Sequence, residues 1–150
     1  MLAVATAVLL AAAPVCPASD ARAYLLALHE TTRQGHLRGD AAAIAGTVGD
    51  RLLLAENGAI RVQSKAEVAK FFADYLGRVR YRLWRDVSQP TVVVSPDGQM
   101  AWMAVAVEAH YSRADKPAEA EKSFKSSWIA TYQRDKCAWR MTGIASDLAD

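Results

Sequence analysis

Apolar residues recur at helical spacing in three segments of the first half of the chain. These segments span about residues 20–34, 40–48 and 65–76. Ser19 is a candidate N-cap for the first helix and Asp40 for the second. Ser64 and Glu67 form a capping box at the start of the third, in which each residue satisfies one unpaired N–H group of the helix. The pattern therefore predicts three helices, all before residue 78.

The second half of the chain alternates apolar and polar residues, which is typical of strands. The predicted long strands span 79–88, 91–95, 99–112, 121–133 and 137–146. Two shorter apolar runs, 51–55 and 59–63, flank Asn57-Gly58, a strong hairpin signal. Helices lead and strands follow, so the class is α+β. Strands of this length curl, which predicts a curved antiparallel sheet forming a cone, with the three helices over its concave face.

The alternation also predicts which side chains face into the cone, since neighbouring residues of a strand point to opposite faces. The odd positions of 99–112 are all apolar or aromatic, so they are assigned to the inner face. The same rule turns Val79, Tyr81, Leu83 and Val87 inward on the first long strand. The predicted lining of a largely apolar ligand pocket is Tyr24, Tyr81, Met103, Phe124, Trp128 and Tyr132.

Polar residues that could carry chemistry are few. Glu108 and His110 lie two residues apart on the predicted outer face, with Cα atoms roughly 6.5 Å apart. We interpret them as a charged pair on that face, with an acid–base dyad as the alternative. Asp50, at the mouth of the sheet, is the candidate catalytic base. Its alternative role is that of a turn residue paired with Arg51 or with solvent.

The N-terminal residues have the character of a secretion signal. Residues 2–13 are an apolar run of 12, counting one threonine, which is shorter than the roughly 20 residues that span a bilayer. We predict a signal peptide at 1–18, cleaved before Ser19, and a single mature domain at 19–150. The protein would then be secreted or periplasmic, without a stable membrane anchor. No Lys or Arg precedes the apolar run, and an N-terminal helix of the mature fold is the alternative.

Cysteine content and charge exclude some classes of protein. Cleavage would remove Cys16 and leave Cys137, which must then be buried or pair with another chain; burial is the expectation. His29 and His36 are two helical turns apart, too far to share an ion, so no metal is expected. No organic cofactor is expected either. The net charge of +2 is too small for a dedicated nucleic-acid binder.

The order of elements, the Gly39-Asp40 helix start and the Asn57-Gly58 hairpin resemble the SnoaL-like, ketosteroid-isomerase-like superfamily. This superfamily is also called nuclear-transport-factor-2-like, or the cystatin-like cone. Segments 81–102 and 126–146 are similar to a bacterial branch that is often secreted. The resemblance implies a homodimer with a pocket inside each cone. The isomerase tyrosine and base would fall at about Thr32 and Ala55, so those catalytic residues do not carry over.

These observations favour a domain that binds a small hydrophobic or aromatic molecule and forms a homodimer. One alternative is a cofactor-independent enzyme of the isomerase, cyclase or hydrolase type that uses Asp50 or a pocket tyrosine. A second is a dimerising interaction module whose outer face, with Trp102, meets another protein.

Overall fold

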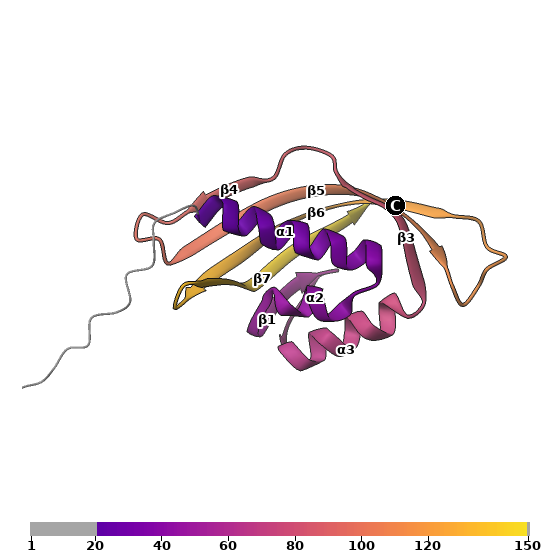
Figure 1. Cartoon of the computed structure of the whole chain (residues 1–150), viewed down its shortest axis with the longest axis horizontal. Coiled ribbons are helices and arrows are strands. Elements are labelled where there is room, and N and C mark those ends of the chain that lie inside the picture. The colour runs from indigo at the N-terminus through magenta and orange to yellow at the C-terminus, as the bar shows by residue number, and fades with distance from the viewer. Residues whose placement is uncertain (1–20, 150) are drawn as a thin grey trace, which may run out of the picture.

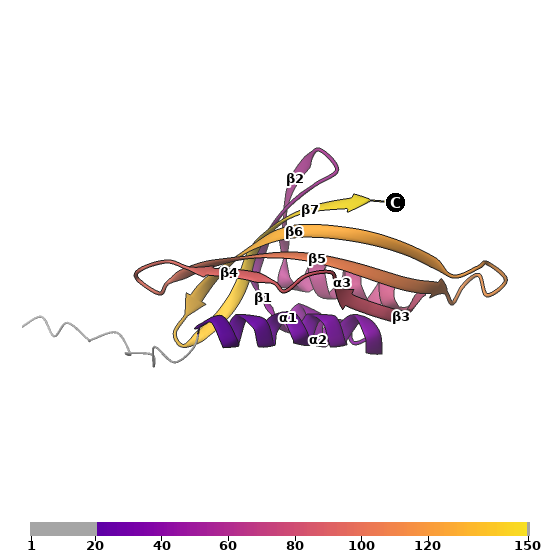
Figure 2. The ribbon, with the colours of Figure 1, turned by 90° about the horizontal axis from the view of Figure 1, so that it is seen from above.

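The computed structural model describes residues 21–149 (Figures 1 and 2). The predicted signal peptide, its cleavage site and Cys16 lie outside these residues. The helices are α1 (Ala21–Arg38), α2 (Ala41–Gly46) and α3 (Lys65–Leu76). The strands are β1 (Val48–Glu56), β2 (Ala59–Ser64), β3 (Val79–Asp86), β4 (Thr91–Val94), β5 (Met100–Arg113), β6 (Lys122–Asp135) and β7 (Ala138–Ala149).

The strands form one curved, open sheet in the order β2-β1-β7-β6-β5-β3, with β4 also paired to β5. Figure 2 shows the sheet arched over the helices, which occupy its concave side. The predicted α+β cone is therefore confirmed. One pairing departs from the predicted antiparallel sheet. Strand β1, which follows α2, runs parallel to β7, the last strand of the chain.

The predicted caps at Asp40 and Ser64 are present, and the third, Ser19, lies outside the described residues; α1 is longer than expected. The Asp40 side chain accepts from the Ala43 N–H group, and both bonds of the capping box at Ser64 are formed. Helix α1 continues through Gly35, where an added Cβ would lie 2.5 Å from Ile44 Cγ1. Gly35 therefore serves the close packing of α1 on α2 and does not end the helix.

The inner face of β5 was assigned correctly. Its odd-numbered residues from Ala101 to Ala109 are buried beneath the helices, and Tyr111 is partly buried. The aromatic residues Tyr132 and Trp139 are buried in the same core. Burial of these large side chains, each contributing about 1.5–3 kcal/mol, holds the helices on the concave face.

A β-bulge overturns the predicted alternation on β3. The ladder with β5 pairs Tyr81 with Tyr111 and then Leu83 with His110, so Arg82 is an extra residue. Past this point the inner row continues with Trp84 and Asp86, which pair with Ala109 and Val107. Leu83 therefore turns to the outer side, and Val87 is 56% exposed. The odd-numbered positions do not all face inward on β3, because the inserted residue moves every later side chain to the opposite face of the sheet.

Cys137 corrects another expectation. It lies exposed in the turn between β6 and β7 and is disulfide-bonded, so it is not a buried single thiol. Cys137 is exposed because it lies in the turn, whereas Trp139, two residues further along in β7, is buried. Across residues 21–149, no helix has both the length and the apolar character needed to cross a membrane.

Candidate functional site

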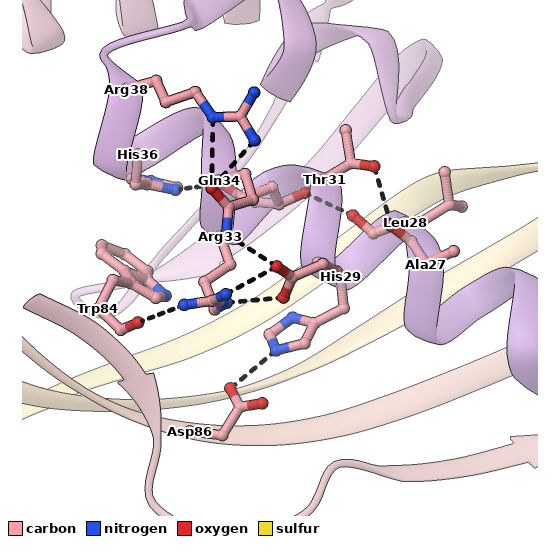
Figure 3. A network of polar contacts seen from close by, with 12 residues as sticks. Ala27, Leu28, His29, Thr31, Arg33, Gln34, His36, Arg38, Trp84 and Asp86 are labelled. Carbon is pink, nitrogen blue, oxygen red and sulfur yellow. Dashed lines mark hydrogen bonds and ion pairs between the residues drawn. The ribbon is translucent and has the colours of Figure 1, made fainter.

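Two histidines of α1 face the sheet. His29 and His36 are seven residues apart, which places them on the same side of the helix, and they are 8% and 7% exposed. The rest of this buried stripe includes Leu25 and Gly35. A polar network therefore lies between α1 and β3, within an otherwise apolar layer (Figure 3).

His29 forms the central contact of this network. Its Nε2 lies 2.8 Å from Oδ1 of Asp86, whose side chain is 29% exposed at the end of β3. Because a carboxylate only accepts hydrogen bonds, the N–H group at Nε2 donates to Asp86. The carboxylate therefore orients the imidazole ring, as it does in many sites that contain a histidine.

Arg33 and Glu30 form a second ion pair beside it. Arg33 Nε and Nη2 donate to the two Glu30 oxygens at 2.6 and 2.7 Å, and Nη1 donates to the Trp84 carbonyl at 3.2 Å. The Arg33 bonds, helped by Gln34, lower the pKa of Glu30 to about 2. The pKa of Arg33 is raised, first by its bond to Glu30 and more weakly by the charges of Glu30 and Asp86. The guanidinium is thus fixed between α1 and β3.

His36 packs among aromatic side chains of the core. Its ring stacks on Trp84 with centroids 3.9 Å apart and meets Phe72 and Tyr81 edge-on. Nδ1–H donates to the Thr32 carbonyl at 2.8 Å. Burial lowers the pKa of His36 to about 4, so the ring is neutral at pH 7 and behaves as part of the aromatic core.

The residues predicted to line the pocket are distributed over two environments. Tyr81 and Phe124 lie within the aromatic cluster around Trp84, where Tyr81 also hydrogen-bonds to Tyr75. Trp128 lies beside His29, with ring centroids 6.2 Å apart. The remaining members differ in burial: Met103 and Tyr132 are buried in the core, and Tyr24 is exposed on α1. A pocket formed by all six stays a prediction.

Asp50, the candidate base, is exposed on β1. It lies where the pairing of β1 with β7 is interrupted, between Val48 and Leu53. It belongs neither to the aromatic cluster nor to the network around His29, and its catalytic role stays a prediction.

Glu108 and His110 lie on the convex face, as the alternation predicts. His110 Nε2 is 3.1 Å from Glu108, and His110 Nδ1 is 3.3 Å from Glu121. Arg85 and Arg82 bind the same two carboxylates at 2.6 and 2.7 Å. The pair is therefore part of a surface charge network that occupies both nitrogens of the imidazole.

The alternation of apolar and polar residues did not identify the His29–Asp86 site, but the sequence contained one other signal for it. The spacing of His29 and His36 places both on one helix face, and a buried face lined by histidines points toward polar partners on the sheet. Asp86 had no such signal, because only the bulge at Arg82 turns it inward. Within residues 21–149, no group of three or more potential ligand side chains is placed to hold a metal ion.

The depressed pKa of His36 predicts a specific loss of stability in acid. The unfolded chain takes up a proton near pH 6.5 and the folded chain only near pH 4, so protonation between these values favours unfolding. The contribution is fully present above pH 6.5 and is lost as the pH falls toward 4. His36→Phe should remove up to about 3 kcal/mol of this pH dependence. Urea denaturation of both proteins at several pH values measures it, and parallel curves would contradict it.

No protein-family model matches the sequence, and no curated protein is significantly similar to it. Solved structures are similar in fold. A ketosteroid isomerase-like protein from Erwinia carotovora atroseptica SCRI1043 is 15% identical, with a TM-score of 0.69 over 88% of this chain and 98% of that one. An NTF2-like protein from Cytophaga hutchinsonii ATCC 33406 is 12% identical, with a TM-score of 0.67 over 87% and 99%.

A type 2 hexachlorocyclohexane dehydrochlorinase is 10% identical, with a TM-score of 0.69 over 86% of this chain and 85% of that one. At these identities the likeness concerns the fold, and it agrees with the element order and the helix caps described above. The chain therefore has the fold of the SnoaL-like, ketosteroid-isomerase-like and nuclear-transport-factor-2-like superfamily.

Proposed function

We propose that the protein binds a small, uncharged and largely apolar molecule at the concave face of its sheet, with the His29–Asp86 pair as the polar anchor. The 2.8 Å contact between these two side chains carries the proposal. The buried imidazole and the partly buried carboxylate are costly to desolvate, and pairing offsets that cost. Together with Trp128, they provide one polar end in an aromatic environment, which is the composition of small-molecule sites.

The charges around the pair favour an uncharged ligand. Asp86 and Glu30 are carboxylates, and Arg33 bonds to Glu30. The two carboxylates and the guanidinium together leave one net negative charge beside the His29 ring. Glu30 already occupies two N–H groups of Arg33, which weakens the attraction of the guanidinium for an anionic ligand. Hydrophobic or aromatic molecules with one polar group fit this arrangement best.

We also propose that the protein works outside the cytoplasm, in the periplasm or the medium. The apolar run at residues 2–13 supports this, because its length and composition are those of the hydrophobic segment of a secretion signal.

A second copy of the chain is the proposed partner of the convex face. Paired residues form an apolar row across the sheet: Val93, Trp102, Thr131, Gly143, Leu53 and Val62. The neighbouring row alternates small and larger residues: Thr91, Ala104, Ile129, Ala145, Ala55 and Ile60. Three alanines of this row and Ile129 are among the residues that line a hollow of about 580 Å³. Trp102, 38% exposed, lies beside it, so a two-fold axis could seat each Trp102 in the hollow of the other copy.

The binding proposal predicts a selective thermal shift. Uncharged aromatic and alicyclic compounds should raise the melting temperature, by an amount equivalent to about 2.7 kcal/mol at 100 times Kd, and aryl carboxylates and fatty acids should not. His29→Gln should reduce the shift. His110→Gln is the matched control, because His110 also bonds to a glutamate but lies on the opposite face. The proposal is wrong if no uncharged compound acts, or if both variants respond equally.

The dimer proposal predicts that Trp102→Asp sediments as a monomer at concentrations where the wild-type protein is a dimer. A charge in the centre of an apolar interface stays unpaired and costs several kcal/mol. Phe71→Asp, on the exposed side of α3, provides a control that should leave assembly unchanged. An unaltered sedimentation coefficient for Trp102→Asp would exclude this face as the interface.

The compartment proposal predicts that the full chain, expressed in a bacterial cell, is recovered outside the cytoplasm in a shortened form. N-terminal sequencing should begin at Ser19. Recovery of the uncut chain in the cytoplasmic fraction contradicts secretion, and a different first residue contradicts only the cleavage site.

A further inference from the structure

We propose that His36 is an acid-sensitive latch, which holds α1 on β3 while its ring is neutral and releases the helix when the ring gains a proton. Release opens the edge of the concave face, where His29 and Asp86 lie between the same two elements. The latch regulates the proposed binding site, and its biological consequence rests on that proposal. The separation of α1 from β3 needs no ligand and can be measured by itself.

The His36 ring lies where three elements of the fold meet. It stacks on Trp84 of β3 with ring centroids 3.9 Å apart, and it meets Phe72 of α3 and Tyr81 of β3 edge-on at 5.5 and 5.6 Å. Nδ1–H donates to the Thr32 carbonyl, and within the described part of the chain Nε2 has no hydrogen-bond partner. A proton at Nε2 therefore adds a buried N–H group that lacks an acceptor among these contacts.

The charges around His36 do not compensate for a proton on its ring. Burial, chiefly, and the charge of His29 on α1 lower the pKa of the ring to about 4. The pKa values of Tyr75 on α3 and Tyr81 on β3 are raised by burial, so both phenols stay neutral. Across the described residues, no carboxylate is among the groups that act on the ring. The face of Trp84 attracts a cation, but this effect is smaller than the loss of hydration in a buried site.

Separation of α1 from β3 leaves the sheet intact, because β3 is an edge strand paired on one side with β5. The contacts between the two elements include the His36–Trp84 stack, the bond from Arg33 to the Trp84 carbonyl and the His29–Asp86 pair (Figure 3). None of these contacts belongs to a strand ladder. Loss of the aromatic stack exposes the two polar contacts to water, where such pairs contribute little.

Hydrogen exchange of the ligand-free protein tests the latch. In the open form the pKa of His36 is that of a solvated ring, near 6.5, and in the closed form it is about 4. Lowering the pH from about 6.5 to about 4.5 should therefore favour opening about 40-fold. Mass spectrometry of α1 peptides, corrected for the intrinsic pH dependence of exchange, should show this loss of protection. Peptides from β5 and β6 should keep their protection.

Two variants separate the latch from a general effect of acid. His36→Phe keeps an aromatic ring against Trp84 but takes up no proton, so its α1 peptides should stay protected at about pH 4.5. His110→Gln is the matched control, since it removes a histidine from the convex face and should lose α1 protection as the wild-type protein does. The C2–H signal of His36 in the NMR spectrum of the wild-type protein needs no variant, and it should titrate near pH 4.

Four results would overturn the latch. The α1 peptides keep their protection in acid, His36→Phe loses protection as the wild-type protein does, or the His36 signal titrates near pH 6.5. In the fourth, the β5 and β6 peptides exchange together with α1, which indicates global unfolding in place of a local separation. Because none of these measurements uses a ligand, the latch and the binding site can fail separately: an absent thermal shift removes the binding site, and unchanged α1 protection removes the latch.

Discussion

The extra residue at Arg82 determines which side chains of β3 meet α1. Before it, Tyr81 points into the core; after it, the inner row passes to Trp84 and Asp86. Without this register shift, Asp86 would point away from the helices and His29 would lack its carboxylate. Trp84 would likewise leave the ring stack with His36. One change in strand register therefore positions both the aromatic core and the candidate site.

Helix α1 provides the opposite half of this arrangement. Gly35 allows it to lie close to Ile44 of α2, and its buried stripe presents two histidines to the sheet. The two rings have different roles because their partners differ. His29 faces a carboxylate near the edge of the core, whereas His36 is enclosed by aromatic rings and stays neutral. Identical residue types on one helix face thus supply polarity at one position and packing at the other.

The fold was predictable from the sequence because its signals are local. Ser64 and Glu67 identify a helix start, Asn57-Gly58 a hairpin, and the alternation along β5 an inner face, each from neighbouring residues. The candidate site was not, because it depends on Asp86 crossing to the inner face through a bulge that the alternation does not reveal. The disulfide state of Cys137 was missed because the predicted cleavage leaves it as a single cysteine.

The parallel pairing of β1 with β7 has a consequence for how the chain folds. It joins the first strand of the sheet to the last, so the β1–β2 hairpin has no sheet to extend until β7 has been made. A two-stranded hairpin is only marginally stable in water, and long-range strand pairing is slow to form. The ribosome must therefore release nearly the whole chain before the sheet can close. The order of synthesis thus delays closure of the sheet until the end of translation.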